Sequence, residues 1–412
     1  MSRAFLVALF LATPALAADP PTWTQWRGPT RDGIAPAGTA KWPDKLAGDA
    51  LTQVWRVKEL GPSYSGPIVS TDTVFTTETR DKKTEWVSAY DRATGKKKWE
   101  ASWTGSVEVP FFAAKNGSWI RSTPTFDDGR LYVLGIRDRL VCLDAATGKE
   151  LWKFDFTDQY KTGTPTFGAV CSPLLDDTAV YIAGGGRFVK LDKKTGKELW
   201  SGMKDGGGMS GGSFSCPVFA TLAGREQIVV QGRTTLAGLD RATGKELWKQ
   251  AIPSMRGMNI LTPTTLGDTV FTSTYGGGTR GLKVLKSGDG FRAEETFNFK
   301  YDGYMSSPVL IDGRAYYLGR DQTATCVDVK SGKQAWRSDK RFGQYWSLVA
   351  NGDKILALDQ KGVLYLLRAN PKELEILDER KVADAETWAH LAVCGDVLFV
   401  RDLNGLTAWK WK

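Results

Sequence analysis

Histidine and cysteine are scarce in this chain of 412 residues, which contains one histidine and five cysteines. No two cysteines are adjacent, and none is separated from another by only two residues. These absences exclude the spaced Cys and His ligands of zinc sites and the Cys-x-x-Cys pair of thiol redox motifs. With one histidine, only carboxylates remain as further side-chain ligands of note, so metal binding is not expected.

The odd number of cysteines requires at least one thiol to stay free or to pair between chains. Cys142 and Cys326 occupy matching positions in sequence repeats, where small buried core residues are expected. Cys171 and Cys216 lie on neighbouring repeats, one place out of register. Their spacing is compatible both with two free thiols and with a disulfide.

Long apolar runs are absent after residue 17. The first residues, MSR, are followed by AFLVALFLATPALA, which Pro14 interrupts and which is shorter than the roughly 20 residues of a membrane-spanning helix. Residues 1–17 therefore predict a secretory signal that is cleaved before Ala18. No cysteine stands at that point, so a lipoprotein is not expected. We expect a soluble exported protein, periplasmic or secreted, and we also expect it to be a monomer.

The formal net charge is +9, of which Arg3 belongs to the predicted signal. An excess of this size permits an acidic partner, an anionic lipid surface or an anionic ligand, and it also serves solubility. The basic residues are spread through turns, and many of the aromatic residues recur at repeat positions. Nucleic-acid binding is therefore not expected.

The most prominent feature of the sequence is a repeated segment of ten residues. LDAATGKELW, LDKKTGKELW and LDRATGKELW begin at residues 143, 191 and 239, a constant spacing of 48. Looser copies end at Trp99 and Trp336. A period of this length is typical of propellers and solenoids, in which each repeat is one small structural unit.

One unit, residues 172–200, predicts four short strands joined by tight turns. The aspartate and threonine of the D-x-x-T-G segment can bond the turn backbone, and Gly196 suits a positive φ. Trp200 is large enough to reach the neighbouring sheet. Because one such sheet cannot bury both faces, the repeats predict an all-β propeller. We expect tryptophan anchors between blades at Trp55, Trp99, Trp152, Trp200, Trp248 and Trp336.

A small residue followed by proline precedes each tryptophan by about thirty residues and predicts the start of an innermost strand, where proline is tolerated. The pairs begin at Gly66, Thr123, Ser172, Cys216, Thr262 and Ser307. Two further units start near Trp346 and Ala389, which gives eight blades of four antiparallel strands. The last unit lacks a fourth strand, which residues 51–57 can supply. The predicted organisation is a signal (1–17), a surface-packed segment (18–50) and the propeller (51–412).

The unit (A/L)-x-D-x-x-T-G-K-x-x-W resembles the tryptophan-docking repeat of propellers of the pyrroloquinoline-quinone (PQQ) type, over residues 51–412. The resemblance implies three kinds of protein. Quinoprotein alcohol dehydrogenases bind PQQ and calcium above the central channel. The outer-membrane assembly lipoprotein uses its ring as a non-catalytic scaffold. Exported PQQ-like repeat proteins form the third group, which the opening WTQWRGPTRDG resembles.

Departures from these families separate the alternatives. The adjacent cysteines typical of quinoprotein alcohol dehydrogenases are absent, and so is the lipidated cysteine of the assembly lipoprotein. No converging set of calcium ligands is visible, because Asp321, Asp359 and Asp402 stand where this repeat uses turn-forming aspartates. The resemblance therefore supports the propeller fold for this chain more directly than it supports either the dehydrogenase activity or the assembly role.

A binding site is expected on the face that carries the loops before the innermost strands and those between second and third strands. Long inserts fall there, at residues 103–121 and 203–215. Each second-to-third loop holds at least one basic residue. A cationic collar or a solvated surface can be formed by Arg80, Arg137, Arg187, Arg233, Arg280, Arg320, Lys361 and Arg401. Trp346 and Trp388 can stack on a planar ligand, and His390 favours a buried, hydrogen-bonded role.

The sequence thus predicts an exported, non-catalytic propeller that binds a protein partner of the envelope or the secreted space, or a small anionic ligand, on this face. The alternative is a PQQ-dependent dehydrogenase of an alcohol or a sugar, with calcium as the accompanying ion. No catalytic set of residues is legible in either case.

Overall fold

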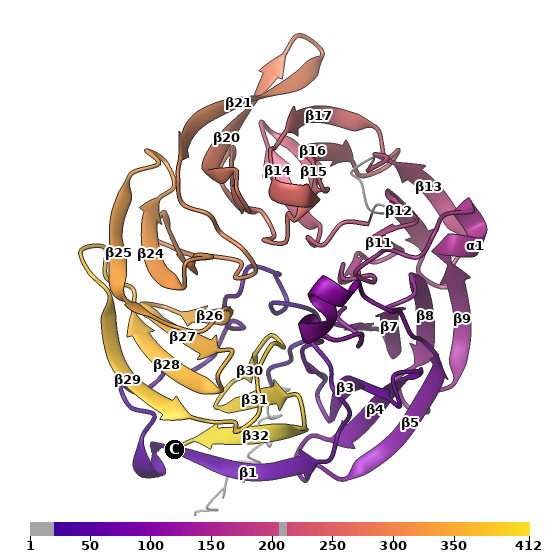
Figure 1. Ribbon diagram of the computed structural model, residues 1–412, viewed down its shortest axis with the longest axis vertical. Coiled ribbons are helices and arrows are strands. Elements are labelled where there is room, and N and C mark those ends of the chain that lie inside the picture. The colour runs from indigo at the N-terminus through magenta and orange to yellow at the C-terminus, as the bar shows by residue number, and fades with distance from the viewer. Residues whose placement is uncertain (1–19, 206–211) are drawn as a thin grey trace, which may run out of the picture.

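The computed structural model describes residues 20–205 and 212–412. It contains eight sheets of four antiparallel strands arranged as a ring (Figure 1), which confirms the predicted eight-bladed all-β propeller. The predicted signal, residues 1–17, lies outside the described residues, as does part of the insert at 203–215. No helix in the described ranges is long and apolar enough to cross a membrane.

The first four blades follow one another along the chain, and each begins with its inner strand. Blades one and two contain β2 (Ile68–Val69), β3 (Thr73–Arg80), β4 (Thr84–Asp91), β5 (Lys97–Thr104), β6 (Thr125–Asp127), β7 (Arg130–Gly135), β8 (Arg139–Asp144) and β9 (Glu150–Asp155). Blades three and four contain β10 (Leu174–Leu175), β11 (Ala179–Gly184), β12 (Arg187–Asp192), β13 (Glu198–Gly202), β14 (Val218–Leu222), β15 (Arg225–Gln231), β16 (Thr235–Asp240) and β17 (Glu246–Ala251).

The last four blades complete the ring. Blades five and six contain β18 (Thr264–Leu266), β19 (Thr269–Thr274), β20 (Gly278–Ser287), β21 (Gly290–Phe299), β22 (Val309–Ile311), β23 (Arg314–Leu318), β24 (Thr323–Asp328) and β25 (Gln334–Arg341). Blades seven and eight contain β26 (Trp346–Asn351), β27 (Lys354–Asp359), β28 (Val363–Arg368), β29 (Glu375–Lys381), β30 (Ala392–Cys394), β31 (Val397–Asp402), β32 (Gly405–Trp411) and β1 (Leu51–Lys58). The short helical turns are η1 (Gly48–Ala50), η2 (Phe111–Asn116), α1 (Phe156–Tyr160) and η3 (Met255–Gly257).

Strand β1 closes the ring as the outermost strand of blade eight. It pairs with β32 from Leu51 opposite Trp411 to Lys58 opposite Gly405. The N-terminal strand therefore completes the sheet of the C-terminal blade and leaves no open edge between the two ends of the repeat array.

The repeated turn follows from local hydrogen bonds. In blade two, Oδ1 of Asp144 accepts the N–H (2.8 Å) and the hydroxyl (2.7 Å) of Thr147, and the Gly148 N–H donates to the carbonyl of Asp144. Gly148 has a φ of 75°, a value that glycine adopts without strain. The fixed D-x-x-T-G spacing is therefore that of an Asx-type turn.

In most blades the tryptophan at the end of the repeated segment contacts the turn of the next blade. The Trp99 indole N–H donates to the carbonyl of Ala145 (3.0 Å), and its ring lies so close to Gly148 that a Cβ there would come within 2.5 Å. The indoles that donate to the next blade in the same way are those of Trp55, Trp152, Trp200 and Trp336. Trp248 differs, because it donates to Oε1 of Gln227 in its own blade (2.6 Å).

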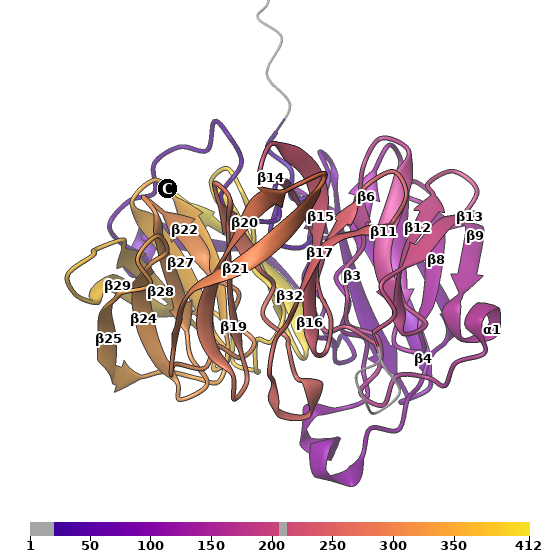
Figure 2. The same ribbon diagram turned by 90° about the horizontal axis from the view of Figure 1, so that it is seen from above.

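The segment before β1 crosses one end of the central channel. Trp23 pairs with Val69 of blade one, and Ala35 and Ala350 of blade seven are joined by an N–H···O bond of 2.8 Å. Figure 1 shows this indigo segment at the centre of the ring, and Figure 2 places it on the side opposite the purple turn η2. Residues 23–35, whose docking place the sequence left open, are hereafter called the plug.

Two buried arginines fix the plug to the inner strands. Arg27 donates to the carbonyl of Pro308 in blade six. Arg31 donates to the carbonyls of Pro173 (2.6 Å) and Ser172 (3.0 Å) in blade three. Burial lowers the pKa of the Arg27 guanidinium to about 10, and burial lowers the pKa of Arg31 as well. Arginine side chains keep their charge in proteins at neutral pH. The plug therefore holds two cations among main-chain carbonyls of the channel wall.

A buried carboxyl group between blades two and three makes the stability depend on pH. Asp138, in the loop between β7 and β8, is 1% exposed, and its Oδ2 accepts the N–H of Gly185 (2.7 Å). Burial raises the pKa of Asp138 to about 7, although the Gly185 N–H opposes this change. Since the folded-state pKa exceeds that of the unfolded chain, this contribution to stability is complete below pH 4 and is lost as the pH rises to 7.

We therefore expect Asp138→Asn to raise the free energy of unfolding at pH 8, on the order of 1–2 kcal/mol, and to change it little at pH 4. Asparagine keeps the acceptor and tolerates the φ of 64° found at this position. Urea titrations at both pH values test this. Asp91→Asn is the control, with the opposite pH dependence expected. Hydrogen bonds from Thr94 lower the pKa of Asp91, so its ionised form contributes stability that is lost at low pH. Equal effects of Asp138→Asn at the two pH values would contradict the assignment.

Candidate functional site

A belt of hydrogen bonds joins the inner strands around the channel. In blades two to six, the residue before the proline of the small-residue–proline marker accepts, through its side chain, the N–H of the matching residue one blade earlier. The Gly66 N–H donates to Oγ1 of Thr123 (2.9 Å), and the Thr123 N–H donates to Oγ of Ser172 (3.0 Å). The Thr262 N–H donates to Oγ of Ser307 (3.0 Å) in the same manner. The small residue before the proline thus accepts hydrogen bonds from backbone N–H groups beside the channel, in addition to preceding the innermost strand.

Blade four contributes a thiol to this belt. The Ser172 N–H donates to Sγ of Cys216 (3.3 Å), and the Cys216 N–H donates to Oγ1 of Thr262 (3.0 Å). In blades six to eight the direction of the bonds reverses, because the N–H donates to the preceding blade. The Trp346 N–H donates to Oγ of Ser306 (2.8 Å), and the Leu391 N–H donates to Oγ of Ser347 (2.7 Å). Cysteine therefore stands at a position where blades two, three, five and six have the hydroxyl group of serine or threonine.

The residues two places before the belt line a cavity of about 230 Å³ in the channel. Extended backbone alternates its side chains, so these residues lie on the same side of the chain as the belt residues and nearer the mouth. Every blade supplies one: Tyr64, Arg121, Val170, Phe214, Ile260, Met305, Tyr345 and Trp388. Phe167, Met258 and Tyr304 add to the wall, and Trp26 of the plug also lines it. The cavity is therefore mainly aromatic and apolar, and blocked at the plug.

One side of the wall is a continuous aromatic cluster that carries a cation. The Tyr64 ring lies 5.5 Å from Trp388 and 5.8 Å from Trp119, and the Trp388 ring stacks at 6.3 Å on Tyr345. The guanidinium of Arg121 lies 5.1 Å from the centre of the Tyr64 ring. Burial lowers the pKa of Arg121, and the Tyr64 hydroxyl opposes this effect. A charged group thus faces an otherwise apolar wall.

His390 lies between this cavity and the plug. Its ring is 6.3 Å from Trp23 and 5.9 Å from Trp26. Burial lowers the pKa of His390 to about 3, and Arg27 adds to the effect, so the imidazole is neutral at physiological pH. Its Nδ1–H donates to the carbonyl of Leu391 (2.9 Å), because a carbonyl can only accept. This is the buried, hydrogen-bonded geometry that the sequence favoured.

The eight basic residues of the expected collar do not gather around this cavity; among the described residues that line it, none of the eight is present. Three are buried within the blades. Arg401 donates to the carbonyl of Gly61 (2.5 Å), Arg233 to that of Arg256 (2.8 Å), and Arg280 to that of Gly277 (2.6 Å). These guanidinium groups satisfy loop carbonyls and do not line the central cavity, although Arg280 and Arg320 together line a separate open pocket of about 620 Å³.

The other five lie nearer the surface of the loop-rich face. Arg80 forms ion pairs with Glu78 and Glu100. Arg187 and Arg320 lie over tyrosine rings, at 3.9 Å from Tyr160 and 4.3 Å from Tyr275. Arg137, Arg320 and Lys361 are exposed. Only these three present an accessible charge, and a binding role for them stays a prediction.

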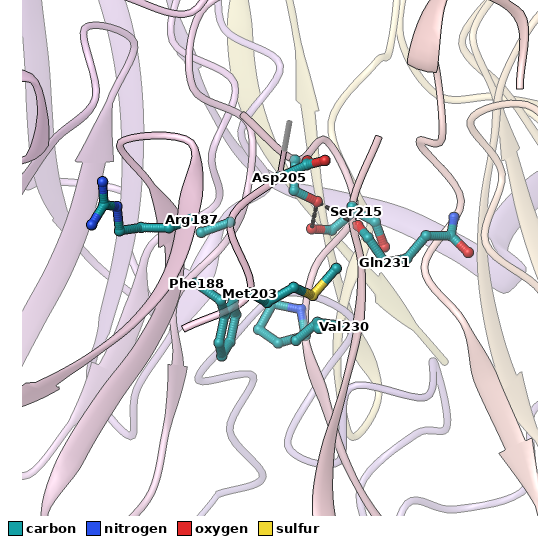
Figure 3. A pocket seen from close by; sticks show the side chains of 11 residues that line it. Arg187, Phe188, Met203, Asp205, Ser215, Val230 and Gln231 are labelled. Atoms are coloured by element: carbon teal, nitrogen blue, oxygen red, sulfur yellow. Dashed lines mark hydrogen bonds between the residues drawn. The ribbon is translucent and has the colours of Figure 1, made fainter. Parts of the chain in front are cut away.

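Two further positions lie outside the cavity. Trp346 is 2% exposed and packs against Phe342 at 4.4 Å, so it belongs to the core. Arg187 borders a separate pocket between blades three and four (Figure 3), whose volume is only about 20 Å³. Figure 3 shows the Arg187 guanidinium directed away from Ser215 and Gln231. A space of that size holds a single water molecule at most.

The cavity does not fit a calcium-bound quinone. None of the described residues that line it is Asp or Glu, whereas calcium takes six to eight oxygen ligands that usually include carboxylates. The carboxylates of nearby loops serve their own turns: Asp359 accepts the Lys361 N–H (2.7 Å) and Asp402 accepts the Asn404 N–H (2.8 Å). Among residues 20–205 and 212–412, no group of three or more His, Cys, Asp and Glu side chains is placed to hold a metal ion.

Comparisons with known proteins agree with the geometry of the ring. A family model described as "Outer membrane protein assembly factor BamB" matches residues 83–338, more than half of the chain. No curated protein sequence matches.

Solved structures share the fold at low identity. BamB from Moraxella catarrhalis has a TM-score of 0.61 at 17% identity, covering 88% of this chain and 98% of that one. A europium-containing methanol dehydrogenase has a TM-score of 0.54 at 13% identity, covering 94% and 91%. The quinohemoprotein alcohol dehydrogenase from Comamonas testosteroni has a TM-score of 0.53 at 14% identity, covering 95% and 81%. Scaffold and enzyme thus share one architecture, and these identities establish the fold alone.

Proposed function

The chain belongs to the family described as "Outer membrane protein assembly factor BamB", and from this premise we propose that it is an exported, non-catalytic propeller that binds a protein partner on its loop-rich face. The observation that carries the proposal is the cavity at the centre of that face. An assembly factor of this architecture needs a surface for a partner, and residues of all eight blades build this concave, mainly apolar cavity.

The cavity suits a side chain of a partner protein. Its aromatic wall supplies rigid apolar area, which is typical of binding hot spots. Met258 and Met305 are unbranched and can adjust to the shape of the inserted group. Arg121 provides one cation beside Tyr64, so a carboxylate next to the inserted group would be matched. We therefore infer a partner segment with an exposed apolar residue and an acidic neighbour.

The rim adds an electrostatic preference. Arg137, Arg320 and Lys361 are exposed in loops of the same face. Exposed charges of one sign steer an oppositely charged partner and raise the rate of association more than the final affinity. An acidic surface around the inserted segment is therefore part of the proposal.

Substitution of Trp388 tests the proposed surface. Trp388 is half-buried and stacks between Tyr64 and Tyr345, so truncation removes contact area without opening the blade core. We expect Trp388→Ala to weaken partner binding by about 2 kcal/mol, or roughly thirtyfold in Kd. A photo-crosslinking amino acid at Trp388 first identifies the partner in cells, and calorimetry with that purified partner then gives Kd.

The matched control carries the same crosslinker at Thr147, which is exposed in a turn at the opposite end of the blades. Adducts of the same partner at both positions, or at neither, would contradict the proposal. A parallel titration with PQQ, with and without calcium, follows the fluorescence of the 16 tryptophans. Saturable binding that requires calcium would favour the alternative, a quinone-dependent dehydrogenase, over a binding module.

A further inference from the structure

Two of the five cysteines differ from the others in their surroundings. All five, which lie in the described part of the chain, are buried free thiols. Cys142, Cys326 and Cys394 lie on blade strands β8, β24 and β30. Cys171 and Cys216 instead lie immediately before the inner strands of blades three and four, beside the channel.

The sulfur atoms of this pair flank one residue. Sγ of Cys216 accepts the Ser172 N–H (3.3 Å), and Sγ of Cys171 lies 3.7 Å from the carbonyl oxygen of Ser172. The two thiols are close enough to interact with each other across the boundary between the blades. The structure thus brings together two cysteines that are 45 positions apart in the chain.

The plug places a cation beside the pair. Arg31 is 2% exposed and interacts with the side chain of Cys216, while its Nε–H has no hydrogen-bond partner among the described residues. Burial would raise the pKa of the Cys216 thiol, but Cys171, Arg31 and the Ser172 N–H together hold it below its ordinary value. Burial instead raises the pKa of Cys171. An arginine next to one of two thiols is the arrangement that makes that one the nucleophile.

Access distinguishes the two sulfur atoms as well. Cys216 lines the central cavity, whereas Cys171 does not. A small reagent that enters the mouth between the aromatic residues reaches Cys216 first. Sγ of Cys216 is therefore the sulfur atom that borders the cavity, lies beside the Arg31 cation and neighbours the second thiol.

We propose that Cys216 and Cys171 form a redox-active pair, in which a small hydroperoxide entering the cavity oxidises Cys216 and Cys171 resolves the product as a disulfide. In the first step the Cys216 thiolate attacks the terminal peroxide oxygen; an S–O bond forms, the O–O bond breaks, and the alkoxide takes a proton to leave as an alcohol. In the second step Cys171 attacks the sulfenic sulfur; an S–S bond forms, the S–O bond breaks, and the hydroxide leaves as water with the Cys171 proton. Two thiols lose two electrons, which the hydroperoxide accepts.

Oxidation changes the belt at one boundary. In the reduced protein Sγ of Cys216 accepts the Ser172 N–H, as hydroxyl groups do between other blades. In the disulfide this sulfur atom turns toward Cys171, so a covalent bond replaces the hydrogen bond between blades three and four. The wall of the cavity at Cys216 changes at the same time, which links the oxidation state to whatever occupies the cavity.

The test treats the purified, fully reduced protein with hydrogen peroxide and maps thiols by alkylation and peptide mass spectrometry. We expect a cross-linked peptide pair containing Cys171 and Cys216, which dithiothreitol reverses. Cys142, Cys326 and Cys394 serve as internal controls, and the Cys216 thiol should be lost at least about tenfold faster than theirs. Equal rates for all five cysteines, or oxidation of Cys216 without a link to Cys171, would overturn the proposal.

Two serine variants separate the roles. Cys216→Ser keeps an acceptor for the Ser172 N–H, because serine holds the same belt position in blades three and six. It should fold normally and leave Cys171 reduced under peroxide. Cys171→Ser should stop the reaction at a sulfenic acid on Cys216, which a cyclic 1,3-dione traps. Trapping at Cys171 in the Cys216→Ser variant would reverse the assignment, and no trapping at Cys216 in the Cys171→Ser variant would refute it.

Discussion

A chain that begins at Gly61 is expected to lose the cooperative unfolding transition of the full-length protein, because it lacks strand β1. This strand pairs with β32 from Leu51 to Lys58, and its removal exposes the outer edge of blade eight. It also removes Trp55, whose indole N–H donates to Arg92 of blade one (3.0 Å). Blades eight and one then share much less contact, and we expect the loss of most of the 5–15 kcal/mol that is typical of a folded domain.

A circular permutant isolates the role of β1 from that of the plug. The N–H of Lys412 donates to the carbonyl of Ala50 (3.1 Å), so the C-terminus lies beside the start of β1. A two-residue Asn-Gly turn can therefore join Lys412 to Leu51 as a hairpin, in a chain that runs from Gly61 and ends after Lys58. Both chains lack residues 20–50, and only the permutant has β1. Urea unfolding followed by circular dichroism should show a cooperative transition for the permutant alone; equal midpoints would contradict ring closure by β1.

Loss of Arg31 is expected to cost on the order of 2–4 kcal/mol of folding free energy, because two buried carbonyl groups lose their donor. Its guanidinium donates to the carbonyls of Ser172 (3.0 Å) and Pro173 (2.6 Å) in the first residues of blade three. Arg31→Met keeps much of the side-chain volume but leaves these buried acceptors without their donor, and an unsatisfied buried polar group is costly. The effect should appear as a lower midpoint of urea unfolding at an unchanged slope.

Arg137→Met is the matched control, since Arg137 is exposed on the loop-rich face. Substitutions at such positions usually change stability by no more than about 0.5 kcal/mol. Arg31→Lys should fall between the two, because an ammonium group cannot reproduce the forked geometry of a guanidinium. If Arg31→Met and Arg137→Met are equally mild, the arginine does not hold the plug in place.

The fold could be predicted because its determinants are local and repeated. The turn at Asp144 to Gly148 is stabilised by hydrogen bonds within six residues, and the same letters recur at each turn of this kind. The number of blades followed from counting such units and the small-residue–proline marker. Closure by β1 followed from the missing strand of blade eight, which only another part of the chain could supply.

The candidate site was harder to predict, because the spacing of residues in a loop does not determine the direction in which their side chains point. Arg137 and Arg401 occupy matching loops, yet Arg137 is exposed and Arg401 is enclosed by carbonyls such as that of Gly61. Part of the cavity wall did carry a signal. In the six blades that have the small-residue–proline marker, one wall residue lies two positions before it, and the alternation of extended chain places both toward the channel. The sequence carried no signal for where the plug docks, because Arg27 and Arg31 contact carbonyl groups of residues that are far away in the chain.

The plug also decides how molecules exchange with the interior of the ring. With residues 23–35 across one end, the channel is a well with a single mouth instead of a conduit through the protein. Whatever enters must leave by the same route, past the ring of Tyr64, Phe214 and Trp388. If a partner binds the loop-rich face as proposed, it would trap the contents of the well, and a small molecule would have to bind before the partner and depart after it. The residence time of that molecule would then be set by the partner's dissociation rate.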